Sequence, residues 1–132
     1  MATVKLDLSA VEKMSASAAE TGLRSALGEG ERILKSDILN RPGTGKIYGS
    51  HQASAPGEPP APDTGNLRAN TNADPLLREE GEDLVGRIVA NSAYAEALEK
   101  GTERMAPRPF LSTLRDDHAR DMQQAFVKGA RR

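Results

Sequence analysis

The feature that most constrains this chain is a glycine- and proline-rich stretch at residues 40–66, which cannot continue a helix or a strand. Glycine and proline recur through it at these positions: Pro42, Gly43, Gly45, Gly49, Pro56, Gly57, Pro59, Pro60, Pro62 and Gly65. Proline lacks the backbone N–H, and ordered glycine loses much conformational freedom. A structureless stretch this long is uncommon in a compact domain and is usually functional or mobile. We therefore predict a long mobile loop, with a stiff and extended part at residues 56–62.

One long helix is predicted before this loop, over residues 9–39. Apolar residues recur there at the spacing of one helix face, at Val11, Met14, Ala18, Leu23, Leu27, Ile33, Leu34 and Ile38. Ser9 and Glu12 have the spacing of a capping box. Gly28 and Gly30 lower the helix propensity, so we expect a kink or break near them.

Two strands are predicted after the loop, and a hairpin turn at residues 80–82 joins them. Residues 83–90 are rich in leucine, valine and isoleucine. Residues 71–78 are weakly patterned and are interrupted by Pro75, which cannot donate to a strand ladder. Residues 3–6 are a further short extended segment. A small antiparallel sheet follows from these predictions.

A short helical turn is predicted directly after the loop, and a short helix follows the strands. Asp63 or Thr64 can cap the turn at Asn66–Ala69, because a side-chain oxygen there accepts a hydrogen bond from a free backbone N–H. Ser92 can cap a helix over residues 93–100, which the following glycine ends.

A final helix is predicted over residues 109–128. Near one face it carries Phe110, Leu111, Leu114, His118, Met122, Ala125 and Phe126. Helix, loop, strands and two further helices, in this order, indicate a single α+β domain over residues 1–132.

Charge and composition exclude several function classes. Eighteen basic and nineteen acidic residues give a net charge of −1, whereas dedicated nucleic-acid binders normally carry a basic excess. The absence of cysteine excludes disulfides, thiolate metal sites and cysteine nucleophiles. The apolar runs are too short to span a membrane, and residues 1–8 do not resemble a secretion signal. We expect the protein to stay in the cytosol until it assembles.

The chain has few large apolar side chains to build a core, which favours assembly of several copies. Only two tyrosines and two phenylalanines are present, and many of the hydrophobic residues are alanines, which bury little area each. A protomer of this kind can gain stability by burying surface against copies of itself.

The motifs that would indicate catalysis are incomplete. Residues 43–46 (GTGK) invite a phosphate-loop interpretation, but Asn40 stands where the first glycine is needed and Ile47 where Ser or Thr holds magnesium. His51 and His118 lack the spacing of a zinc site, and we interpret them as a loop residue and a helix-surface residue. No nucleophile-elbow sequence is present. We expect no catalytic residue, no cofactor and no metal.

Arginines cluster in the last third of the chain, at Arg104, Arg108, Arg115 and Arg120. They could contact DNA phosphates or an acidic partner. Acidic residues are interleaved with them, so we favour surface ion pairs, for example between Arg120 and Asp116 or Asp117.

Two segments carry a resemblance to a known family. The first contains ASAPGEPP at residues 53–60 and TGNL at residues 64–67. The second contains YAEALEKGT at residues 94–102 and RPFL at residues 108–111. In this order, over about residues 8–128, they resemble the siphophage head–tail joining family, also described as tail-completion or minor-tail-Z-like proteins. The region of residues 71–78 is less apolar than the family pattern.

The resemblance implies a structural virion protein and no enzyme. Such a protein forms a ring at the phage neck or tail top, completes the tail and joins it to the DNA-filled head. A hexameric homo-oligomer, contacts with stopper or connector and tail-tube proteins, and DNA passing the lumen without specific binding are implied, with no membrane partner. The protein would lie in the virion, after assembly in the host cytoplasm.

The expected interaction residues are Tyr48, His51, Pro56, Pro59, Tyr94, Glu99, Arg104 and Arg108. The alternative functions are a small DNA-associated accessory enzyme of a phage and a DNA-binding regulator. The motifs do not separate the terminator, completion and connector roles.

Overall fold

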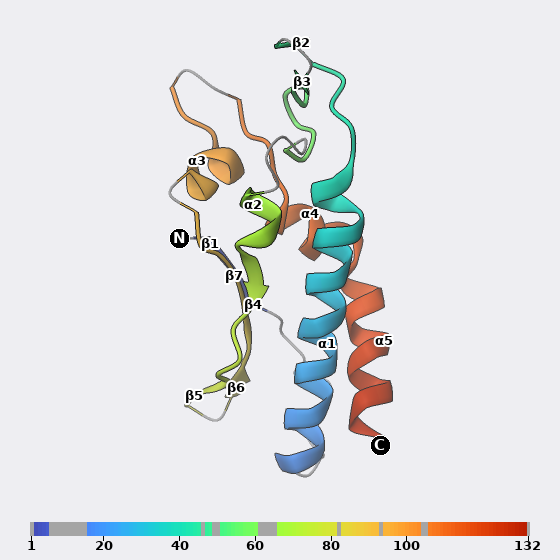
Figure 1. The fold of residues 1–132 in the computed structure, drawn as a ribbon. Coiled ribbons are helices and arrows are strands. Elements are labelled where there is room, and N and C mark those ends of the chain that lie inside the picture. Colours follow the sequence, from blue (N-terminus) through green and yellow to red (C-terminus); the bar gives the residue numbers. More distant parts are fainter. Residues whose placement is uncertain are drawn as a thin grey trace.

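A small antiparallel sheet, a long helix and a C-terminal helix lie side by side in an α+β fold (Figure 1). The computed structural model describes residues 2–5, 16–45, 47–48, 51–60, 66–81, 83–92, 94–103 and 106–131. The predicted fold class is confirmed. None of the helices in these ranges carries an apolar stretch long enough to cross a membrane.

Helix α1 (Ala16–Ser36) is the central element, and a 3₁₀ turn, η2 (Ile38–Asn40), continues it. The break predicted as one possibility near Gly28 and Gly30 is wrong, because α1 runs through both. At Gly30 a Cβ would lie 2.8 Å from Cδ1 of Ile88 and 2.9 Å from Sδ of Met122. Glycine there lets neighbouring elements approach α1 closely. The predicted capping box at residues 9–12 lies outside the described residues.

The main sheet has the strand order β1–β7–β4, and both pairings are antiparallel. The strands are β1 (Ala2–Lys5), β4 (Thr71–Ala73) and β7 (Arg87–Ala90). The predicted strand over residues 71–78 is interrupted after Ala73, where Asp74 accepts a hydrogen bond from the N–H of Leu76 at 3.0 Å. This turn, together with the missing N–H of Pro75, accounts for the interruption.

Strands β5 (Arg78–Glu80) and β6 (Asp83–Val85) pair with each other and form a separate two-stranded hairpin. It confirms the predicted turn, where Gly81 has a φ of 65°. The strand predicted over residues 83–90 is divided at Gly86. A Cβ at this position would meet the Leu27 side chain, with Leu27 Cγ at 3.2 Å, so α1 presses directly on the backbone between β6 and β7.

Helices α2 (Asn66–Ala69) and α3 (Ala95–Lys100) are the two short helices. The turn predicted at α2 is confirmed, and the residues expected to cap it lie outside the described ranges. Helix α3 begins at Ala95, later than predicted. Ser92 contributes its carbonyl oxygen, which accepts from the Ala95 N–H at 3.2 Å, rather than its hydroxyl. The predicted glycine end is confirmed, because Gly101 has a φ of 77° and donates to Ala97 O at 2.8 Å.

The final helix is divided into α4 (Leu111–Asp117) and α5 (Ala119–Ala130), so the prediction of one continuous helix is wrong. The break lies at His118, which has φ −125° and ψ 15°. Aspartate and histidine at residues 116–118 are weak helix formers. The bend lets α4 contact β1 while α5 follows α1 (Figure 1).

The core lies where the sheet, α1, α4 and α5 meet. Its fully buried apolar side chains include Leu34, Ile38, Ile88, Phe110, Leu114 and Met122. Of the residues predicted near one face of the last helix, five are buried in the core: Phe110, Leu111, Leu114, Met122 and Phe126. Helices α1 and α5 approach closely at Gly22, where a Cβ would lie 2.9 Å from the carbonyl oxygen of Phe126.

Candidate interaction surface

The loop between η2 and α2 has internal structure, which corrects the prediction of a structureless stretch. Strand β2 (Ile47–Tyr48) pairs with β3 (His51–Gln52), so Tyr48 lies opposite His51. The Gly45 N–H donates to Ala53 O at 2.8 Å and closes the base of this small hairpin. Ile47, the first residue of β2, is 65% exposed. Whether the loop is mobile in the free subunit remains a prediction.

Glycine is required where the two sides of this loop lie against each other. A Cβ on Gly43 would lie 2.6 Å from the Ser54 nitrogen, and one on Gly45 would lie 2.6 Å from the Ser54 carbonyl oxygen. Both distances involve backbone atoms, which cannot move aside as a side chain does. The glycines of the GTGK sequence therefore serve the loop's own packing.

The Glu58 carboxylate holds the loop together. One oxygen, Oε1, accepts from the Thr44 hydroxyl at 2.6 Å, the Ala55 N–H at 2.6 Å and the Thr44 N–H at 3.3 Å. The hydrogen bond from the Thr44 side chain is the largest cause that lowers the pKa of Glu58, followed by the bond from Ala55. An internal carboxylate thus occupies these donors, which agrees with interpreting GTGK as a turn.

The proline-rich part of the loop bends, so the extended conformation predicted for residues 56–62 is wrong at its start. The Glu58 N–H donates to Ala55 O at 3.0 Å, and Gly57 has a φ of 87°. Proline followed by glycine with positive φ is the pattern of a type II turn. The Gly57 N–H then donates to Pro107 O at 3.0 Å, which attaches the loop to the linker before α4.

Glu99 organises the second segment that carries the family resemblance, residues 94–102 and 108–111. Its carboxylate accepts from the backbone N–H groups of Phe110 at 2.8 Å, Leu111 at 3.0 Å and Ser112 at 2.8 Å. These are the free donors at the start of α4, which has no side-chain cap of its own at Phe110. The Arg108 N–H donates to Leu98 O at 2.6 Å. Glu99 is therefore used within the chain, and we leave it out of the interaction surface.

The fold gathers most of the other expected interaction residues at one end of the molecule. We define the loop end as the described residues of 42–60 together with those of 94–110, and Figure 1 shows both parts at the end opposite the β5–β6 hairpin. Pro56 is exposed and Pro59 is half-buried in the first part. Tyr94, 45% exposed, and half-buried Arg108 lie in the second. The side chains of Tyr48 and His51, and all of Arg104, lie outside the described residues.

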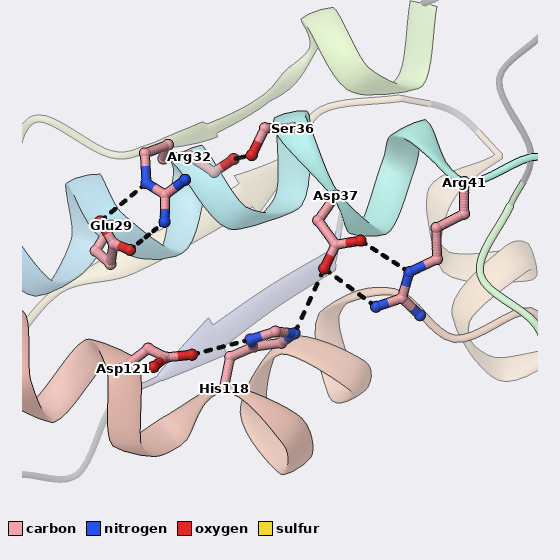
Figure 2. A network of polar contacts seen from close by, with 7 residues as sticks. All are labelled: Glu29, Arg32, Ser36, Asp37, Arg41, His118 and Asp121. Carbon is pink, nitrogen blue, oxygen red and sulfur yellow. Dashed lines mark hydrogen bonds and ion pairs between the residues drawn. The ribbon is translucent and has the colours of Figure 1, made fainter.

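A polar network that the sequence reasoning missed joins α1 to the α4–α5 break (Figure 2). The His118 side chain is only 20% exposed. Its Nδ1 lies 3.2 Å from Asp121 Oδ2, and its Nε2 lies 3.9 Å from Asp37 Oδ2. Arg41 donates from Nε to Asp37 Oδ1 at 3.1 Å, and this bond is the main cause that lowers the pKa of Asp37 and raises that of Arg41.

Only part of this network had a signal in the sequence. Asp37 and Arg41 stand at helical spacing, as do His118 and Asp121, so each pair could have been predicted. Nothing in the sequence brings the two pairs together. Among the other charges, Arg115 pairs with Asp116 at 3.0 Å. The ion pair predicted between Arg120 and Asp116 or Asp117 is not formed among the described residues.

The described part of the chain holds no group of three or more histidine or acidic side chains placed to bind a metal ion. Comparisons of the chain with protein-family models, with curated proteins and with solved structures found no match.

Proposed function

We propose that this chain is a structural virion protein at the neck or tail top of a siphophage or phage-derived particle. It forms a ring that completes the tail and joins it to the head. The observation that carries the proposal is the position of the two segments with the family resemblance. They are far apart in the sequence, yet the Gly57–Pro107 and Arg108–Leu98 hydrogen bonds build them into one end of the molecule.

This arrangement supports a joining role because motifs that serve one contact surface are expected to lie together. The loop end presents Ile47, Pro56 and Tyr94 to solvent. Prolines and an aromatic ring offer apolar contact area that loses little conformational freedom on binding. The partners proposed for this end are the stopper or connector and the tail tube. As the resemblance implies, DNA would pass through the lumen of the ring without specific binding.

The direct test is a reconstruction of the neck in purified particles. We expect density for this chain in a closed ring, and a hexamer is the copy number that the resemblance implies. A single copy, or no copy, at the neck would contradict the proposal. Absence from purified particles would favour the alternatives, a DNA-associated accessory enzyme or a DNA-binding regulator.

A substitution at the exposed Ile47 of the loop tests the joining role. We expect Ile47→Asp to leave the subunit folded, because the side chain is exposed, and to yield heads and tails that do not join. The matched control is Ala16→Asp, which places the same charge on an exposed residue at the start of α1, far from the loop end (Figure 1). Wild-type infectivity of the Ile47→Asp particles would show that this part of the loop has no joining role.

A further inference from the structure

The charges of α1 are largely neutralised within the helix and its extension. Four acidic residues pair with basic residues three or four positions later, as Glu20–Arg24, Glu29–Arg32, Glu31–Lys35 and Asp37–Arg41. Such a surface offers little net charge to a neighbour. Two other surfaces of the molecule are different.

The outward face of α5 carries unpaired basic residues. Arg120, Gln124 and Arg131 are exposed and recur at the spacing of one helix face. Within the described part of the chain, neither arginine forms an ion pair. Lys128 is also exposed and lies near Glu29, and the acidic Asp121 is engaged by His118. Along residues 119–131, three exposed basic residues therefore stand against one acid, Asp121.

The β5–β6 hairpin carries the opposite charge. All three residues of β5 are exposed, and Glu80 lies directly across from Asp83 in the strand register. Like charges at such a position destabilise a hairpin. Arg87 neutralises Glu80 at 2.7 Å, which leaves Asp83 and the exposed Glu79 without an ion pair among the described residues. Arg78, which is also exposed, is the basic residue of β5.

The hairpin has two further properties of a contact element. It forms its own two-stranded sheet, apart from β1, β7 and β4, and an isolated two-stranded hairpin is marginally stable in water. At its base, Leu76 is 67% exposed although its backbone is fixed by Asp74 and by Arg24, which donates to Pro75 O at 2.7 Å. An apolar side chain is thus held outward beside the acidic residues.

We propose that the β5–β6 hairpin of one copy of the chain binds the outward face of α5 on a second copy in the ring. The inference rests on the ring of the proposed function. Figure 1 shows the hairpin and α5 on opposite sides of α1, so one copy cannot pair the two surfaces with each other. A contact between two different surfaces repeats from copy to copy and closes into a ring when the rotation allows it. Arg120 and Arg131 supply the cations that Glu79 and Asp83 lack.

The contact should be weak and sensitive to salt, because exposed ion pairs stabilise little and are screened by ions. Cysteine cross-linking detects such a contact, and the chain has no cysteine of its own. We would mix the single variants Asp83→Cys and Arg120→Cys at about 1 mM, where even millimolar affinities populate the complex. We expect a mixed dimer, and a ladder of larger species when both cysteines are in one chain. Equal or greater cross-linking of either variant alone would overturn the proposal, as would no cross-linking of the mixture.

Charge reversal is the second test. Glu79→Arg with Asp83→Arg should weaken self-association about tenfold, as should Arg120→Glu with Arg131→Glu, since each removes two exposed ion pairs. All four changes in one chain should restore it. Failure of this rescue would overturn the interface. A ring seen at the neck without the cross-link would refute only the interface, whereas the cross-link in a protein absent from particles would refute only the neck function.

Discussion

Two carboxylates organise the loop end, and each does so by accepting hydrogen bonds from backbone N–H groups. Glu99 serves the start of α4, and Glu58 joins Thr44 to Ala55. Both residues lie in segments that the sequence singles out, but their bonding partners could not be predicted. Glu99 reaches residues eleven to thirteen positions later, and no local spacing rule relates such residues.

Replacing Glu99 should destabilise the whole domain. We expect Glu99→Ala to lower the free energy of unfolding by about 1–3 kcal/mol, since it removes charge-assisted hydrogen bonds to three backbone N–H groups. Chemical denaturation would measure the change. Glu96→Ala is the control, because it removes only an exposed ion pair with Lys100 on the same helix, and its effect should be much smaller. Equal effects would contradict the capping role.

The hydrogen bonds of Glu58 should be lost in acid. Because its folded pKa lies below the ordinary value of 4.5, Glu58 contributes stability that is present above about pH 4.5. That stability is lost as the pH falls through the folded pKa. The chemical shift of the Ala55 amide proton, followed by NMR, should report this transition. Thr44→Val removes the largest cause of the lowered pKa and should move the midpoint upward. An unchanged midpoint would contradict this assignment.

At the scale of elements, glycine shows where sequence reasoning succeeds and where it fails. Gly81 and Gly101 were predicted at a turn and a helix end, and both have positive φ. Gly28 and Gly30 were predicted to break α1, which is continuous. Helix propensity is a local quantity, whereas the space beside a glycine depends on elements that are distant in sequence. The same reason explains the unpredicted division of the last helix at His118.

Two glycines of α1 should therefore respond oppositely to alanine. Gly28→Ala should stabilise the protein by about 0.5–1 kcal/mol, because nothing lies within 4 Å of the new Cβ and helix propensity improves. Gly22→Ala should destabilise it by about 1–3 kcal/mol, because the Cβ would lie 2.9 Å from the Phe126 carbonyl oxygen. Thermal unfolding of the two variants measures both effects. Stabilisation by Gly22→Ala would contradict the close packing of α1 on α5.

At the scale of the whole molecule, the loop end should become more ordered on assembly. We expect amides of residues 42–62 to exchange faster in the free subunit than in particles, since glycine, proline and few apolar anchors give this segment low local stability. Hydrogen exchange on both forms is the measurement. Gly45, Gly57 and Glu58, whose N–H groups are bonded, should be the slowest in the free form. Full protection of the segment before assembly would contradict the prediction.

The pairing of distant segments also has a consequence for how the chain folds as it is made. Strand β1 finds its partner only at residues 87–90, and α1 packs along residues 119–130. Contacts between segments so far apart require closure of long loops, which makes folding slow and leaves it dependent on late residues. We expect a nascent chain on the ribosome to hold α1 without its α5 cover until α5 emerges. Subunits still under synthesis would then be unable to enter a ring.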